Sequence, residues 1–201
     1  MQLISKFVSY IFHPLLIPTF GLILLFNTGS YLSYLPFDAQ RAIYIIVFIS
    51  TFILPLSFLP FFLYSEKISS IFMHKKKERL IPLIITVIFY FFAYYILSNL
   101  NAPKIIRLFL FGAACSVLLA LIITYFWKIS THAIGIGGLL ALAFIISFRL
   151  MIDLNLIIMS LIFLCGIVGT ARIYLHAHNP IQVFSGFALG FLSIFLPFQL
   201  F

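Results

Sequence analysis

Long apolar runs alternate with short polar joints along almost the whole chain. Seven runs approach the roughly 20 residues that a helix needs to cross the hydrocarbon core of a bilayer. They cover residues 7–27, 41–64, 80–99, 105–127, 133–149, 154–171 and 181–200. We therefore predict an all-α integral membrane protein, a bundle of about seven transmembrane helices that forms a single domain over residues 1–201.

Turn-forming residues mark the joints between these runs. Asn27-Thr-Gly-Ser30, Asn99–Pro103 and Asp153–Asn155 are typical loop segments, and residues 65–79 form the one strongly polar joint. Proline inside a membrane helix is tolerated where neighbouring helices satisfy the freed backbone groups. The sequence therefore predicts kinks in the first two spans, at Pro18, Pro55 and Pro60.

The composition excludes a soluble domain. Of 201 residues, 64% are hydrophobic and only 8% are charged, so a polar exterior could not be assembled. The formal net charge is +8, but the basic residues gather at the ends of the runs, beside lipid headgroups. We therefore expect membrane lipids and no nucleic acid as partners. The expected location is a bacterial inner (cell) membrane, crossed several times.

Counting seven crossings determines which joints share a membrane face. The N-terminus and the joints at 65–79, 128–132 and 172–180 fall on one face, here called the X face. Every histidine except His13 lies in an X-face joint. We interpret His13, which precedes Pro14, as a packed or interfacial histidine. Ionisable groups at membrane depth are usually functional, so this convergence predicts one composite polar site.

The orientation of the X face does not follow from charge counting alone. It carries eight of the Lys and Arg residues and the opposite face carries four, which taken literally makes the X face cytoplasmic. Six of the eight belong to the candidate site or its cluster, and without them the ratio is two to four. We expect the X face to be external.

Three polar groups make up this X-face site. They combine permanent cations, hydrogen-bond donors and histidines with almost no carboxylate, which suits a phosphate group. Arg and Lys neutralise phosphate oxygens, and a helix N-terminus adds backbone amides. One histidine can attack phosphorus while another protonates the leaving oxygen. The groups are Lys75–Lys77 with Arg79, Lys128–His132, and Arg172–Gln182.

Two of these groups resemble motifs of a known family. Ile129-Ser130-Thr131-His132 resembles Pro-Ser-Gly-His, and Ala171-Arg172-x5-His178-x3-Gln182 resembles Ser-Arg-x5-His-x3-Asp. Both motifs are typical of the type 2 phosphatidic acid phosphatase superfamily of membrane lipid phosphatases. The resemblance covers roughly residues 75–190, and it leaves a six-helix lipid-phosphatase-like core as an alternative to seven helices.

The resemblance implies a role for each residue. His178 would be the nucleophile that forms a phosphohistidine, His132 the general acid, and Gln182 the residue that orients His178. The phosphoryl oxygens would be held by Arg172, Ser130, the amide of Thr131, Arg79 and one of the lysines, Lys75 or Lys76 among them. The implied substrate is a lipid that carries a phosphate monoester or a diphosphate. Prenyl diphosphate, phosphatidylglycerol phosphate and phosphatidic acid are examples. The resemblance implies no cofactor or metal.

The chain also departs from the family pattern. Gln182 replaces an aspartate, and an amide oxygen accepts a hydrogen bond from imidazole without stabilising imidazolium by charge. The comparable Asp→Asn change in a serine protease costs about 10⁴ in turnover. The family's Lys-x6-Arg-Pro motif, aligned on Arg79, would require a lysine at position 72, which is Phe72 in this chain. The motif also has proline directly after the arginine, whereas Pro82 follows Arg79 by three residues.

Several alternatives remain open on sequence grounds. The protein could be a catalytically silent relative that binds or carries lipid phosphates, or a small anion transporter. His132, His176 and His178 could bind zinc, which commonly takes three protein ligands at catalytic sites. In a purely structural interpretation, Ser130 and Asn179-Pro180 are helix N-caps, and Lys75–Lys77 anchor the chain at the membrane surface.

Overall fold

The computed structural model describes residues 2–65 and 76–200 of the chain. Within these residues seven helical segments are long and apolar enough to cross a membrane, and no strand occurs. The predicted all-α membrane bundle is therefore confirmed. The segments cover Gln2–Asn27, Phe37–Tyr64, Leu80–Asn99, Lys104–Phe126, Thr131–Leu150, Asn155–Tyr174 and Pro180–Leu200.

The last five segments are single helices. They are α6 (Leu80–Asn99), α7 (Lys104–Phe126), α8 (Thr131–Leu150), α9 (Asn155–Tyr174) and α10 (Pro180–Leu200). Short 3₁₀ helices lie in two of the joints, η2 (Tyr31–Tyr34) and η4 (Lys76–Arg79). The fifth apolar run, the shortest in the sequence, forms the complete 20-residue helix α8.

The first two segments are interrupted at prolines. The first consists of α1 (Gln2–Ile11), the 3₁₀ helix η1 (Pro14–Leu16) and α2 (Ile17–Asn27). Its break therefore lies at Pro14, not at Pro18 as predicted, because Pro18 falls in the first turn of α2, where a proline is tolerated. The second consists of α3 (Phe37–Phe48), the π-helix η3 (Ile49–Ile53), α4 (Leu54–Ser57) and α5 (Leu59–Tyr64).

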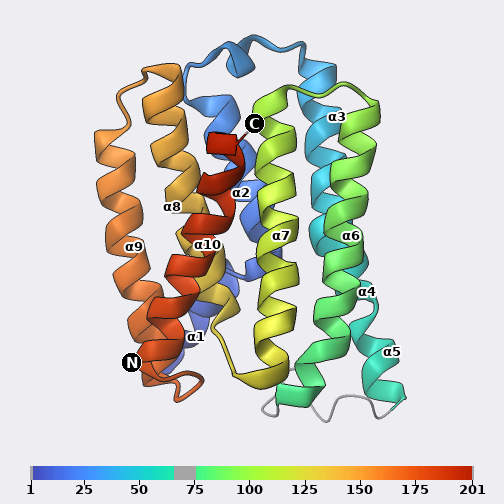
Figure 1. The fold of residues 1–201 in the computed structure, drawn as a ribbon, viewed down its shortest axis with the longest axis vertical. Helices are drawn as coiled ribbons and strands as arrows, with labels where there is room; N and C mark the ends of the chain where they lie inside the picture. Colours follow the sequence, from blue (N-terminus) through green and yellow to red (C-terminus); the bar gives the residue numbers. More distant parts are fainter. Residues whose placement is uncertain (1, 66–75, 201) are drawn as a thin grey trace.

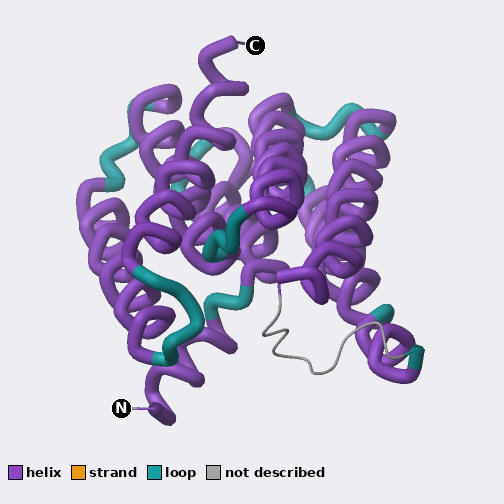
Figure 2. The backbone as a smooth tube through the Cα atoms, turned by 60° about the horizontal axis from the view of Figure 1, so that its bottom comes forward, coloured by secondary structure: helices purple, strands orange, loops and turns teal. Residues whose placement is uncertain are grey.

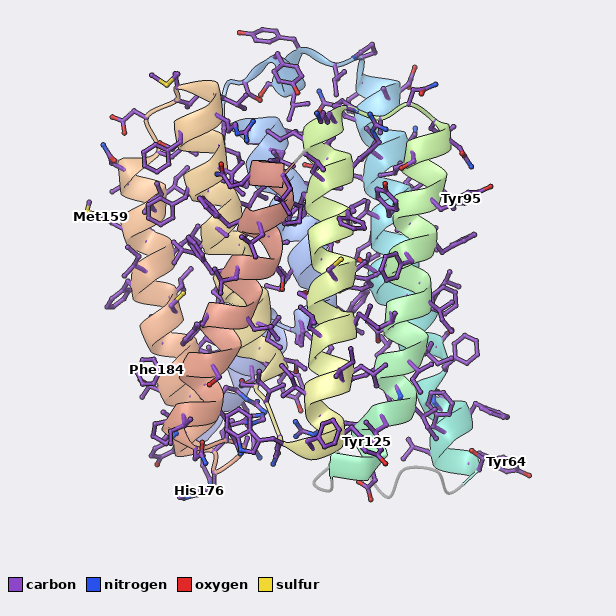
Figure 3. The ribbon with its side chains drawn as sticks, viewed as in Figure 1. Tyr64, Tyr95, Tyr125, Met159, His176 and Phe184 are labelled. Carbon is purple, nitrogen blue, oxygen red and sulfur yellow. The ribbon has the colours of Figure 1, made fainter. Side chains whose placement is uncertain are left out.

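Helix α8 is the most buried of the spanning segments. It packs most extensively against α10, and also contacts α9, α2 and α7 (Figure 1). Helix α6 packs against α7 on the other side of the bundle. The outer surfaces are apolar, and Figure 3 shows Tyr95, Met159 and Phe184 directed away from the bundle, as expected for side chains facing lipid.

Glycines permit the close approach of α8 and α10. A Cβ atom at Gly190 would overlap the carbonyl oxygen of Ile134, and one at Gly186 would lie 2.8 Å from the carbonyl oxygen of Ser130. Close helix contact through small residues is the usual packing mode inside a membrane. The start of α10 consequently lies beside the joint before α8, where the amide of Ser130 donates to the carbonyl oxygen of Gln182 over 3.3 Å.

The predicted X-face joints lie at one end of the bundle. Figure 1 places the N-terminus, the α7–α8 joint and the α9–α10 joint at its lower end, and Figure 2 brings this end forward. The C-terminal end of α10 lies at the opposite end. Two of the three polar groups therefore meet at this end of the bundle, and η4 brings Arg79 of the third group to the same place.

Candidate active site

The turn between α9 and α10 brings Arg172 and His178 to the same site. The amide of Ala177 donates to the carbonyl oxygen of Arg172 over 3.1 Å, and the amide of His176 donates to that of Ile173 over 2.9 Å. These two bonds form a Schellman motif, which requires a left-handed residue at the position of His176. His176 has a φ of 50°, and histidine adopts this conformation more readily than most residues.

His178 is held in one orientation by the first turn of α10. Its Nδ1 lies 3.0 Å from Oε1 of Gln182, which also accepts from the amide of Asn179 over 3.3 Å. In return, Oδ1 of Asn179 accepts from the amide of Gln182 over 2.9 Å, which completes a capping box ahead of Pro180. Because an amide oxygen only accepts, the proton is on Nδ1 of His178 and the lone pair is on Nε2.

The Nε2 lone pair of His178 faces Arg79. The Nη1 group of Arg79, at the end of η4, lies 3.5 Å from this nitrogen. Only 6% of His178 is exposed to solvent. Burial, then the charge of Arg79, then those of Arg172 and Lys128 lower the pKa of His178 to about 3, although the hydrogen bond to Gln182 raises it. At neutral pH, His178 is therefore an unprotonated imidazole among cations.

The second predicted motif opens α8 and lies against the start of α10. Ser130 is fully buried, and its hydroxyl accepts from the amide of Ala133 as the N-cap of the helix. Thr131 is the first residue of α8 and borders the same cavity as His178. The N-cap interpretation of Ser130 is thus observed, and it leaves the first-turn amides of α8 near the site.

His132 and Arg172 both contact a serine that the sequence reading did not include. Nε2 of His132 lies 3.1 Å from the carbonyl oxygen of Ser9, so it carries the proton and donates. Nη1 of Arg172 donates to Oγ of Ser9 over 3.1 Å. Helix α1 therefore contributes to a site that the motifs assign to α8, α9 and α10.

His13 also belongs to this part of the molecule. Its ring lies 5.9 Å from that of His132 in an edge-to-face arrangement, and its Nδ1 accepts from the amide of Leu15. The predicted role of His13 was that of a packed or interfacial histidine. The sequence signal for its place near the site is the i, i+4 spacing of Ser5 and Ser9 ahead of His13-Pro14, which marks a polar stripe that ends at a break.

A cavity of about 940 Å³ connects these groups to the apolar interior. Its polar end is bordered by His132, Arg172, His178, Arg79 and Lys128. The remainder is lined by apolar side chains from several spans, among them Leu59, Leu83, Phe109, Val117 and Ile194. The cavity therefore has a cationic end at the X face and an apolar body within the bundle, as an amphipathic ligand requires.

The remaining predicted residues are lysines. Lys75 and the side chain of Lys76 lie outside the described residues. Lys128, part of the second polar group but without a role in the family resemblance, borders the cavity with Arg79 and Arg172. Burial first, and then the charges of Arg79 and Arg172, lower the pKa of the Lys128 ammonium. Burial also lowers the pKa of Arg79. Surplus positive charge is therefore concentrated at this point.

The zinc alternative is not supported by the arrangement of the histidines. His176 is exposed at the lower end of the bundle (Figure 3), whereas His178 is buried. Across residues 2–65 and 76–200, no group of three or more His, Cys, Asp or Glu side chains is placed to hold a metal ion. Imidazoles and cations instead line one cavity, which suits an anion.

Comparison with known proteins gives one family. The model of the PAP2 superfamily matches residues 124–201, which include the second and third motifs, α8, α9 and α10. No curated protein and no solved structure matches the chain. Residues 124–201 are therefore similar to the PAP2 superfamily, in agreement with the resemblance carried by His132, Arg172 and His178.

Proposed function

We propose that this protein is a membrane lipid phosphatase, which hydrolyses a lipid phosphate monoester or diphosphate through a phosphohistidine on His178. The similarity of residues 124–201 to the PAP2 superfamily suggests phosphatase activity on phosphate esters, often those of lipids. Candidate substrates are of the prenyl diphosphate, phosphatidylglycerol phosphate or phosphatidic acid type.

One observation carries the proposal: the buried, unprotonated Nε2 of His178 lies beside a guanidinium. Gln182 fixes the tautomer, so the lone pair is directed to the place where Arg79 would bind a phosphoryl oxygen. A nucleophile that stays neutral at physiological pH is available without prior loss of a proton. Cations fixed around it would stabilise the charge on the equatorial oxygens in the transition state.

The reaction would then proceed in two steps. Nε2 of His178 forms a bond to phosphorus while the bond from phosphorus to the leaving oxygen breaks, and that oxygen takes up a proton from His132. A water molecule next attacks phosphorus and gives a proton back to His132, the P–N bond breaks, and phosphate and free His178 are released. For His132 to supply the first proton it must be protonated at Nδ1, because its Nε2 proton is engaged by Ser9.

The shape of the cavity supports a lipid substrate. A phosphate bound between Arg79, Arg172 and Lys128 would lie at the X-face end, and the attached chain would extend into the apolar part of the cavity. Because the leaving oxygen joins these two parts, it would lie near the end of the cavity that His132 borders. Membrane lipids around the bundle would supply the substrate laterally.

The amide of Gln182 supports a second candidate function. A neutral acceptor orients His178 but does not offset the charge that its ring acquires as phosphorus is attacked. The same site without turnover would be a lipid-phosphate binder or carrier. The cavity is lined mostly by apolar side chains, which does not favour a path for small anions.

Phosphate release by detergent-solubilised protein tests the proposal. We expect wild type to release phosphate from at least one lipid phosphate without added metal, and His178→Ala to abolish release. His176→Ala is the matched control, because His176 lies in the same joint but is exposed. Gln182→Asp should preserve or raise the rate. Release that persists in His178→Ala would exclude the nucleophile, and lipid-phosphate binding with no release in either Gln182 form would establish the binder.

A further inference from the structure

Helix α1 has its polar face turned into the protein. Ser5 and Ser9, one turn apart, are each only 9% exposed, whereas Leu3 is 83% and Phe7 64% exposed. A membrane helix with this polarity presents apolar side chains to lipid and hydroxyl groups to the bundle. Burying a hydroxyl is costly unless it is hydrogen-bonded, so the buried serines call for partners.

Ser9 makes two hydrogen bonds to the site, one through its hydroxyl and one through its carbonyl oxygen. Its hydroxyl donates to the carbonyl oxygen of Ser5 over 2.9 Å and accepts from Nη1 of Arg172 over 3.1 Å. Its carbonyl oxygen accepts from Nε2 of His132 over 3.1 Å. Ser9 therefore joins Arg172 of the third motif to His132 of the second, although these residues lie 163 and 123 positions away from it in the sequence.

The break after α1 makes this carbonyl oxygen available. Helix α1 ends at Ile11, and the last carbonyl groups of a helix have no partner in a following turn. The backbone of His13 is extended, with a ψ of 133°, and Pro14 has no amide hydrogen to donate. In an uninterrupted helix the amide of His13 would occupy the carbonyl oxygen of Ser9, and His132 would lose its acceptor.

Neighbouring helices hold the break in place. The carbonyl oxygen of Pro14 accepts from the hydroxyl of Tyr90 on α6 over 3.3 Å, and that of Leu15 accepts from Thr51 in η3 over 3.4 Å. Irregular backbone at membrane depth occurs where it is buried in protein or lines a cavity, and Pro14 and Leu15 line this cavity. The interruption is therefore a fixed part of the structure around the site.

We propose that Ser9 is a positioning residue, which holds the guanidinium of Arg172 and the ring of His132 toward a bound phosphate. This rests on the proposed function. The hydroxyl fixes one of the five N–H groups of Arg172 and leaves the others for phosphoryl oxygens. The carbonyl oxygen fixes the His132 tautomer with a proton on Nε2, so Nδ1 is the atom left for the reaction.

Ser9→Ala tests the hydroxyl, with Ser5→Ala as matched control. Both serines are equally buried on one face of α1, but the side chain of Ser5 is not bonded to Arg172. Loss of a hydrogen bond to a charged group predicts a fall of about 10- to 100-fold in kcat/KM for Ser9→Ala. We expect Ser5→Ala to stay within about twofold of wild type, and Ser9→Thr, which keeps the hydroxyl, to recover most of the activity.

Two further measurements separate positioning from folding. Vanadate binding, by inhibition or calorimetry, should weaken in Ser9→Ala while the melting temperature matches that of Ser5→Ala. In a protein that already carries Arg172→Lys, Ser9→Ala should lower kcat/KM by at most about a further threefold, because the two residues act together. Full additivity in this cycle, or equal losses in Ser5→Ala and Ser9→Ala, would overturn the proposal.

The role of Ser9 and the proposed function can fail separately. If wild type releases no phosphate from any lipid phosphate, the phosphatase proposal fails. Vanadate or inorganic phosphate binding then still reports on Ser9. Weaker binding in Ser9→Ala than in Ser5→Ala would support positioning of Arg172 in a binding protein, and unchanged binding would refute it.

Discussion

Replacing Gln182 by glutamate changes the charge beside His178 with little change in shape. Oε1 of Gln182 accepts from Nδ1 of His178 over 3.0 Å and from the amide of Asn179 over 3.3 Å, and a glutamate oxygen can accept both bonds. Glutamate is also the usual partner in a capping box at this position. Gln182→Glu therefore isolates the effect of charge on the proposed nucleophile.

The size of the effect follows from the distance. Unit charges centred about 4 Å apart interact by about 4 kcal/mol at an effective dielectric constant near 20. At 1.36 kcal/mol per pKa unit, this raises the pKa of His178 from about 3 toward roughly 6. His178 stays neutral at pH 7.5, while the cationic ring formed on attack is stabilised. We expect turnover to rise by about 10²–10³-fold.

Two assays on the same protein check this reasoning. Phosphate release at pH 7.5 gives turnover, and NMR of labelled histidine during a pH titration gives the pKa of His178. The double variant Gln182→Glu with His178→Ala should be inactive, which shows that the gain acts through His178. A raised pKa with turnover at or below that of wild type would refute the claim that the missing charge limits catalysis.

Three further outcomes follow from the structure. Gly190→Ala should lower the free energy of unfolding by about 1–3 kcal/mol, because its Cβ overlaps the carbonyl oxygen of Ile134. Gly166→Ala is the control, because a Cβ at Gly166 has no neighbour within 4 Å, and thermal unfolding of both variants measures the difference. His178 resists protonation in the folded protein, whereas an unfolded histidine binds a proton below its ordinary pKa of 6.5. Stability should therefore fall as pH drops from 6.5 toward 4, and the share of His178 is up to about 1.4 kcal/mol per pH unit. His178→Asn should reduce this pH dependence in a series of melting curves. His176→Val should cost about 1–2 kcal/mol because of its left-handed backbone, and His176→Gly should preserve both melting temperature and phosphate release.

Periodicity and spacing in the sequence were sufficient to predict the bundle and part of the site. The seven spans follow from hydropathy, because a bilayer demands helices of one length. The shared face of His132 and His178 follows from counting crossings. The short distance between Arg172 and His178 follows from a spacing of six residues that a helix end and a turn occupy.

The contribution of α1 could not be predicted in the same way. The approach of Ser9 to Arg172 depends on how far α1 is rotated and on where it ends, and neither is encoded by hydropathy. The sequence predicts a kink at Pro18, whereas the break lies at Pro14, where Tyr90 and Thr51 donate to the carbonyl groups after His13. The contact of Arg79 with His178 likewise depends on η4, a short helix that hydropathy does not predict.

The Schellman turn after α9 has a consequence for how the site can open. Arg172 and His178 belong to one unit closed by its own main-chain bonds, so they move together. The partners from α1 and η4, Ser9 and Arg79, reach that unit through single side-chain bonds of 3.1 and 3.5 Å. A bound headgroup would therefore meet Arg172 and His178 at a fixed separation.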